Sequence, residues 1–200
     1  MESKREEELK NLAEKLKKMP YSEFVEVVKN LTEEEILLVS STIGYPVFIR
    51  LCMGELAHII PILQDGAAAI ILDEDGRILL QSRADRNKWG LPGGCQEAGE
   101  SFEEVIVREV KEETDLDVNI EDLEYICTVS GESRRNSYPT GDVVFNNTAL
   151  YCVRKYSGKL KWNQESKEMR FFDEKHLPEN QNDPDVIEFY KKWVMCKERK

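Results

Sequence analysis

The chain has 200 residues, of which 40% are apolar and 34% are charged, a composition typical of one globular domain with an appendage. No apolar run approaches the roughly 20 residues needed to cross a bilayer, and the opening residues MESKREEELK lack the apolar core of a signal peptide. The net charge of −11 opposes binding to nucleic acid or to an anionic membrane, which both require a basic surface. We therefore expect a cytoplasmic protein that binds neither.

Five cysteines are scattered along the chain without a Cys-x-x-Cys pair (Cys52, Cys95, Cys127, Cys152 and Cys196). Their odd number and their spacing argue against disulfides and against a zinc site. Cys95 follows a pair of glycines, and no neighbour in the sequence would activate it as a nucleophile, so we expect an incidental free thiol.

Residues 1–62 are predicted to form a helical extension. Ser22 is a candidate N-cap, Thr32 and Glu35 form a capping box, and Gly44 followed by Pro46 predicts that one helix stops and another starts. Helices are expected at 2–18, 22–31, 33–42 and 46–57. We find no catalytic motif in the extension, and its net acidic charge weakens a helix-turn-helix interpretation. Such helices commonly cap a core or pair subunits, so a homodimer formed through them is one prediction.

Residues 63–200 are predicted to form the second unit, which mixes strands and helices. Two apolar runs flank Asp73-Glu-Asp-Gly76, a pattern that predicts a β-hairpin. A glycine-rich loop follows at 84–94. Further strands are expected at 124–130, 143–153 and 169–172, with a tight turn at Ser157-Gly158 and a final helix at 185–197.

A helix beginning near Ser101 is the most informative element, since Ser101 and Glu104 form a capping box. Apolar residues recur along it at helical spacing (Phe102, Val105, Ile106, Val110 and Leu116). At about 100° per residue, Glu109 and Glu113 fall on this apolar arc and Glu112 falls at its edge.

Three carboxylates on the buried side of a helix are costly unless they meet a counter-charge, and pairs three or four residues apart repel one another. A hard divalent cation bound through oxygen would supply that charge. The alternative is a surface helix with solvated glutamates, which would place these carboxylates opposite the apolar stripe, where Glu104 and Lys111 lie.

The segment also resembles the signature of the Nudix (MutT-like) hydrolases, which reads Gly-x5-Glu-x7-Arg-Glu-apolar-x-Glu-Glu-x-Gly-apolar. The matching positions are Gly94, Glu100, Arg108, Glu109, Val110, Glu112, Glu113 and Leu116. Asp115 stands where the family has glycine, a position that commonly takes a left-handed conformation at a helix end. Aspartate tolerates this conformation better than most residues, so the departure concerns helix termination.

The resemblance implies an α/β/α sandwich, with a mixed β-sheet between helices, and hydrolysis of a phosphoanhydride bond in a nucleoside diphosphate linked to another group. It further implies Mg²⁺, or Mn²⁺ as a substitute, held by Glu109, Glu112, Glu113 and the main-chain carbonyl of Gly94. We expect Arg108, on the flank of the same helix and counted with the catalytic residues, to orient a glutamate through a bidentate pair.

Two other assignments stay open. Glu100 is expected to be structural. The general base is either one of the helix glutamates or an acid from a later loop, with Glu165 and Glu168 as candidates, although exposed glutamates are ordinarily only solvated.

Substrate contacts are harder to predict. Arg83 and Lys88 flank the entry to the glycine-rich loop and are candidates to contact substrate phosphates, with a solvated role as the alternative. Arg134 and Arg135 are weaker candidates for the same task. Trp89 would stack on a base or, as the alternative, belong to the core.

A non-catalytic function is the second hypothesis. In it, a Nudix-like fold senses a nucleotide without turning it over and the helical extension relays the signal. The complete set of acidic motif residues favours the enzyme, whose partner is a small nucleotide-type substrate.

Overall fold

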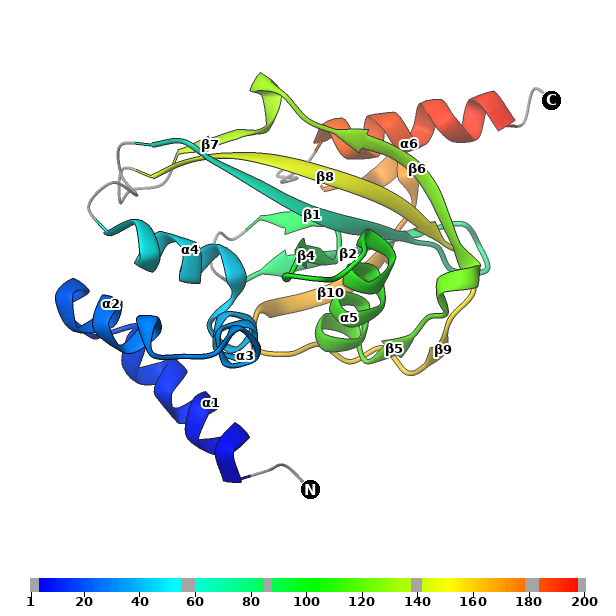
Figure 1. Cartoon of the computed structure of the whole chain (residues 1–200). Helices are drawn as coiled ribbons and strands as arrows, with labels where there is room; N and C mark the ends of the chain where they lie inside the picture. Colours follow the sequence, from blue (N-terminus) through cyan, green and yellow to red (C-terminus); the bar gives the residue numbers. More distant parts are fainter. Residues whose placement is uncertain (1–3, 55–59, 85–87, 138–141, 179–183, 198–200) are drawn as a thin grey trace.

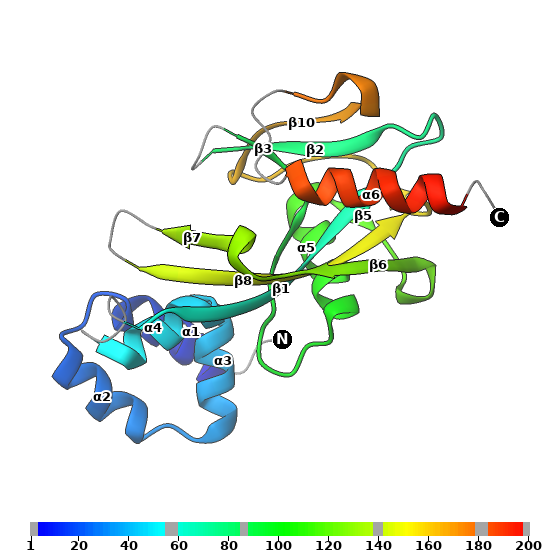
Figure 2. The ribbon, with the colours of Figure 1, turned by 90° about the horizontal axis from the view of Figure 1, so that it is seen from above.

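The computed structural model describes residues 4–54, 60–84, 88–137, 142–178 and 184–197. Figure 1 shows a strand-rich body with four helices gathered at one side, near the amino terminus. Seen from above, the sheet that contains residues 78–83 and 166–172 lies in a different layer from the larger sheet that contains residues 62–71 and 143–153 (Figure 2).

The four amino-terminal helices pack around a small apolar core of their own. They are α1 (Lys4–Leu16), α2 (Tyr21–Lys29), α3 (Glu33–Ile43) and α4 (Tyr45–Met53), and their buried residues include Leu16, Phe24, Val39 and Phe48. An amphipathic helix gains most of its stability from burying such a stripe. Among the described residues no single helix reaches the length and apolarity of a membrane span. Only α3 and α4 taken together do so, and they are bent by 109° at their junction.

The ends of these helices test the capping predictions. The capping box at Thr32 is confirmed: Thr32 Oγ1 accepts from Glu35 N at 3.2 Å, and Thr32 N donates to Glu35 Oε2 at 3.0 Å. Gly44 ends α3, and Pro46 lies in the first turn of α4 as predicted. The predicted cap at Ser22 is wrong, because α2 begins at Tyr21 and has no side-chain cap.

The larger sheet is mixed. Its strands run in the order β4 (Gly93–Cys95), β1 (Ile62–Ile71), β8 (Val143–Val153) and β6 (Leu123–Val129), and β7 (Arg135–Ser137) also pairs with β8. Strands β1 and β8 are parallel over their whole length, from Ile62 opposite Val144 to Ile71 opposite Val153, and the other pairs are antiparallel.

Two smaller sheets complete the strands. One has the order β10 (Ser166–Phe172), β2 (Ile78–Arg83) and β3 (Trp89–Gly90), and the other pairs β5 (Leu116–Asp117) with β9 (Ser157–Gly158). The short helices η2 (Ile120–Asp122), η3 (Glu132–Arg134) and η4 (Glu174–His176) lie in the connections.

Two local predictions from the sequence are wrong. The turn after β1 forms, with Asp73 Oδ1 accepting from Arg77 N at 2.8 Å, but β1 and β2 enter different sheets and share only the isolated bridge Leu72–Ile78. A turn signal reports local geometry only. It carries no information on the distant strand β8, with which β1 pairs. Ser157-Gly158 is a short strand rather than a tight turn.

Alternation along the central strands builds two apolar layers. Ala69 and Ile71 of β1 join one core cluster, whereas Ile70 and Leu72 join the other, as the period of two in a strand requires. Helix α5 (Phe102–Thr114) covers the first face and α6 (Pro184–Lys197) covers the second (Figure 1). The predicted α/β/α sandwich is therefore confirmed.

Candidate active site

Helix α5 is built as its sequence predicts. Ser101 Oγ accepts from Glu104 N at 3.2 Å, and Ser101 N donates to Glu104 Oε2 at 2.7 Å. Val105, Ile106 and Val110 are completely buried, so the apolar stripe fixes the rotation of the helix against the sheet.

Asp115 ends α5 in the left-handed region, with φ 59° and ψ 11°. It is the one non-glycine residue with positive φ among those the structure describes. This conformation costs a non-glycine residue on the order of 1 kcal/mol, and ion pairs of its carboxylate with Lys111 at 3.1 Å and Lys161 at 3.0 Å offset part of that cost. The unusual residue thus ends the helix and leaves the glutamates in place.

Glu113 is almost completely buried, with 2% of its surface exposed. Its carboxylate accepts from Gly93 N at 2.9 Å and from Gln81 Nε2 at 3.0 and 3.1 Å. Burial disfavours the charged form more than these hydrogen bonds favour it, and it raises the pKa of Glu113 to about 7. Near neutral pH, the Glu113 carboxyl is therefore protonated in part of the molecules.

Arg108 ties the neighbouring carboxylates together. Its Nε and Nη2 donate to the two oxygens of Glu100 at 2.7 and 2.9 Å, and Nη1 donates to Glu109 Oε1 at 2.6 Å. Burial nevertheless outweighs Arg108 and raises the pKa of Glu109. The bidentate partner is Glu100 and not a glutamate of the helix, which agrees with a structural role for Glu100 and makes Arg108 a brace for Glu109.

Glu112 differs from its neighbours because 58% of its side chain is exposed, and Arg108 Nη1 lies 3.6 Å from its Oε2. Helical rotation of about 100° per residue carries it off the apolar arc. The sequence places Glu112 at the edge of the apolar arc, whereas the structure leaves more than half of its side chain in solvent.

The glycine-rich strand β4 allows close approach to these acids. A Cβ added at Gly94 would overlap the carboxylate of Glu109, and one added at Gly66 would overlap the carbonyl oxygen of Gly94. Glycine at both positions lets two strands and a helix meet at the Gly94 carbonyl. The contact is one that no other residue type would permit without movement.

Replacing Gly94 by alanine is expected to lower turnover by about tenfold or more, since it displaces Glu109 from its contact with strand β4. The melting temperature should change little, because the displaced atoms are the end of a flexible side chain. Steady-state kinetics and thermal unfolding of the purified variant provide the measurement.

Gly76→Ala is the matched control for that variant. Gly76 has open space around its Cα but a φ of 75°, so alanine there should cost about 1 kcal/mol of stability and leave turnover unchanged. Wild-type turnover in Gly94→Ala would show that the position of Glu109 does not matter.

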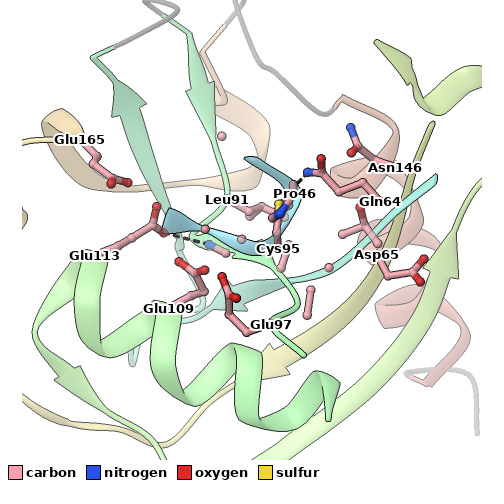
Figure 3. Close-up of a pocket in the computed structure, with 18 of the residues that line it drawn as sticks. Pro46, Gln64, Asp65, Leu91, Cys95, Glu97, Glu109, Glu113, Asn146 and Glu165 are labelled. Atoms are coloured by element: carbon pink, nitrogen blue, oxygen red, sulfur yellow. Dashed lines mark hydrogen bonds between the residues drawn. The ribbon is translucent and has the colours of Figure 1, made fainter. Parts of the chain in front are cut away.

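A cavity of about 810 Å³ opens between α5, β4, α4 and the first halves of β1 and β8. Glu109, Glu113 and Glu165 lie toward one end, which we call the acidic end (Figure 3). Gln64, Asp65 and Asn146 lie toward the other, which we call the amide end. Glu112, Gly94 and Cys95 also line this cavity.

The candidate bases are separated by the structure. Glu165 lines the cavity and contributes, after burial and other causes, to the raised pKa of Glu109. Glu168 lies on an exposed position of β10, with its carboxylate 3.8 Å from Arg170, and is not among the lining residues. Of the two loop candidates, Glu165 is therefore the one that lines the same cavity as the acids of α5.

The candidate substrate contacts also divide. Arg83 and Arg134 line the cavity, whereas Lys88 and Arg135 are exposed and do not. Trp89 packs edge-on against Phe172, with 4.8 Å between the ring centroids. This contact agrees with the alternative that Trp89 belongs to the core. The sequence Tyr138-Pro-Thr-Gly-Asp142 also predicts a turn, but residues 138–141 lie outside the described residues.

Several lining residues carry no sequence signal. Arg50 and Pro46 come from α4, Asp142 precedes β8, and Asn147 lies within β8. The parallel pairing of β1 with β8 brings Asn147 to the cavity, and the contacts of α4 with Glu97 and Asp142 bring Arg50 and Pro46 there. No local sequence pattern encodes either set of contacts. Cys95 accepts a hydrogen bond from Gln64 Nε2 at 2.6 Å, and burial raises the pKa of its thiol, as expected of an inert cysteine.

The acidic end suits a hard cation by its donors. Carboxylate and carbonyl oxygens are the ligands that Mg²⁺ and Mn²⁺ prefer. Burial raises the pKa of both Glu109 and Glu113, so a bound cation would favour their charged forms. In the described part of the chain no three His, Cys, Asp or Glu side chains converge on one point, because Glu113 faces Gly93 and Glu112 is exposed. The donor chemistry fits a cation, and its binding requires the side chains to reorient.

Comparison with known proteins identifies the chain. A model of the NUDIX domain matches residues 62–193. A Methanocaldococcus jannaschii protein named ADP-ribose pyrophosphatase is 34% identical over 127 residues, which cover 62% of this chain and 70% of that relative.

Solved structures agree in fold. The MutT protein from Methanosarcina mazei has a TM-score of 0.54 at 22% identity, covering 69% of this chain and 97% of that one. The NUDIX domain of Shewanella oneidensis NrtR, solved with ADP ribose, has a TM-score of 0.50 at 21% identity, covering 68% and 89%. The chain belongs to the NUDIX family and is a hydrolase acting on phosphoanhydride bonds.

Proposed function

We propose that this chain is a Mg²⁺-dependent hydrolase of a nucleoside diphosphate linked to another group. The single observation that carries the proposal is the acidic end. There Glu109 and Glu113 line the cavity with Gly94, and burial raises the pKa of both carboxyls. The name of the Methanocaldococcus relative, an ADP-ribose pyrophosphatase, supports a substrate of this class.

The residues have distinct parts in this proposal. Glu109, Glu112, Glu113 and the Gly94 carbonyl would hold Mg²⁺, with Mn²⁺ as a substitute. A bound divalent cation would neutralise the diphosphate and lower the pKa of a water molecule into attacking range. Arg108 keeps Glu109 in position through its hydrogen bond.

Glu165 is the acid that we propose as general base, because it lines the cavity beside the α5 glutamates and belongs to a different element. Arg83, which also lines the cavity, would contact substrate phosphates. Lys88 stays a weaker prediction of the same kind, since it lies outside the cavity lining.

A panel of nucleoside triphosphates and nucleoside diphosphate derivatives, incubated with and without Mg²⁺, tests the proposal. We expect cleavage of at least one diphosphate derivative that stops when the metal is removed. Metal-independent cleavage would refute the metal assignment. If a derivative binds tightly and remains intact after hours, the non-catalytic sensor is the better description.

Three further predictions belong to the proposal. The division into an extension at 1–62 and a hydrolase domain at 63–200 is one, and limited proteolysis tests it. A homodimer formed through the amino-terminal helices is another, and a monomer mass from light scattering of the full chain would refute it. Cell fractionation tests the predicted cytoplasmic location.

A further inference from the structure

Helix α4 of the amino-terminal extension is fastened to the hydrolase body at two points beside the cavity. Tyr45 N, in the first turn, donates to Glu97 Oε1 at 3.1 Å, which places a carboxylate at the positive end of the helix. Arg50, one turn further on, lies 3.6 Å from Asp142 Oδ2, and their side chains are 21% and 11% exposed. The helix is thereby held against the body.

This attachment makes α4 a wall of the cavity. Pro46, Val47 and Arg50 all line it, together with Gly44 at the start of the helix. Pro46 appears on the side of Gln64 and Asn146, across from Glu113 and Glu165 (Figure 3). Pro46 of α4 therefore lies at the amide end.

The amide end offers closely spaced donors and acceptors. Asn147 Nδ2 donates to Asp65 Oδ1 at 2.8 Å, and Arg50 forms its ion pair with Asp142. Two aspartates would repel a group that is only anionic. No described residue that lines this end is aromatic, so the amide end offers a base no stacking partner. Paired carboxylates, amides and a guanidinium instead match hydroxyl groups, which donate and accept at once.

We propose that Arg50 is a specificity-determining residue, supplied by the amino-terminal extension, and that it and the amide end recognise a hydroxyl-rich group attached to the substrate diphosphate. This inference rests on the proposed function. It adds the chemical class of the group that α4 contacts, a hydroxyl-rich group on the diphosphate. Arg50 would hydrogen-bond hydroxyl oxygens while Asp142 holds its guanidinium in place. It takes no part in bond cleavage.

The test compares two substrates that share the nucleoside diphosphate and differ in the attached group: ADP-ribose, which carries a sugar, and the β-methyl ester of ADP, which carries none. The wild type should prefer ADP-ribose in kcat/KM. Arg50→Ala should lose that preference by about tenfold or more, through a higher KM for ADP-ribose. Its kcat and its kinetics on the methyl ester should stay near wild type.

Arg5→Ala is the matched control, because Arg5 lies in the same extension and pairs with Glu35 away from the cavity. It should keep the wild-type preference. Equal losses on both substrates in Arg50→Ala would show a structural role only, and unchanged kinetics would show none, so either result overturns the inference. If Arg50→Ala fails to fold, Arg50→Lys, which keeps the charge but lacks the planar donor fork, should still lower the preference, and a wild-type ratio would overturn the inference.

The same assay separates the two levels of the proposal. A wild type that cleaves neither substrate in the presence of Mg²⁺ refutes the proposed function, and the inference falls with it. A wild type that cleaves both without any preference refutes only the inference.

Discussion

Replacing Glu112 by glutamine is expected to lower kcat by at least about 100-fold. Loss of a residue that only hydrogen-bonds to a metal ligand commonly lowers metal affinity or activity by about 10- to 100-fold, and loss of a ligand should cost more. The fold should survive. More than half of the Glu112 side chain is exposed, and its ion pair with Arg108 spans 3.6 Å, so the substitution strands no buried charge. Steady-state kinetics with saturating Mg²⁺ and thermal unfolding together provide the measurement.

Two companion variants sharpen this result. Glu104→Gln lies on the same helix but faces solvent and retains a capping side chain, so it should keep wild-type turnover. Glu113→Gln should lose turnover as Glu112→Gln does. Near wild-type turnover in both Glu112→Gln and Glu113→Gln would show that the assigned carboxylates do not bind the metal.

The second large effect is expected in the pH dependence of metal binding. Glu113 has an ordinary pKa of 4.5 that burial raises to about 7, so in the metal-free protein it contributes stability below pH 4.5 that is lost as the pH rises through about 7. Metal binding requires the deprotonated carboxylate. Affinity for Mg²⁺ or Mn²⁺ should therefore fall about tenfold for each pH unit below about 7.

Thermal unfolding measures the metal affinity without any substrate. A ligand that binds only the folded state stabilises it by an amount that grows with the logarithm of ligand concentration divided by Kd, and the melting temperature rises accordingly. Added Mn²⁺ should raise the melting temperature clearly at pH 8 and much less at pH 5.5. Glu104→Gln should behave as the wild type does. A shift of equal size at both pH values would show that the metal does not displace protons from buried carboxylates.

The features that were predictable from sequence are those whose determinants are close along the chain. Ser101 and Glu104 define the start of α5, and the apolar stripe with Glu109 and Glu113 defines its buried face, all within a few helical turns. The departure at Asp115 was interpretable for the same reason, since it concerns one backbone conformation. These local signals are enough to identify the helix, its orientation and the family resemblance.

The features that were not predictable depend on strand pairing between distant segments. Asp73-Glu-Asp-Gly76 correctly predicted a turn, but β1 leaves its expected partner because β8 pairs along its whole length. The amide end arises from the same pairing, which brings Asp65 to Asn147. Arg50 was invisible as a cavity residue because its helix is fastened there by Glu97 and Asp142, contacts that no local pattern encodes.

The most direct measurement is product analysis of ADP-ribose cleavage by the full chain, with Mg²⁺ present and with Mg²⁺ removed by a chelator and then restored. Hydrolysis of the phosphoanhydride bond yields AMP and ribose 5-phosphate, which chromatography separates from ADP and ribose. We predict AMP and ribose 5-phosphate in the presence of metal, none after chelation, and recovery on restoring Mg²⁺. Formation of ADP and free ribose, or undiminished cleavage after chelation, would contradict the assignment of Glu109, Glu112 and Glu113 to a metal-assisted attack on the diphosphate.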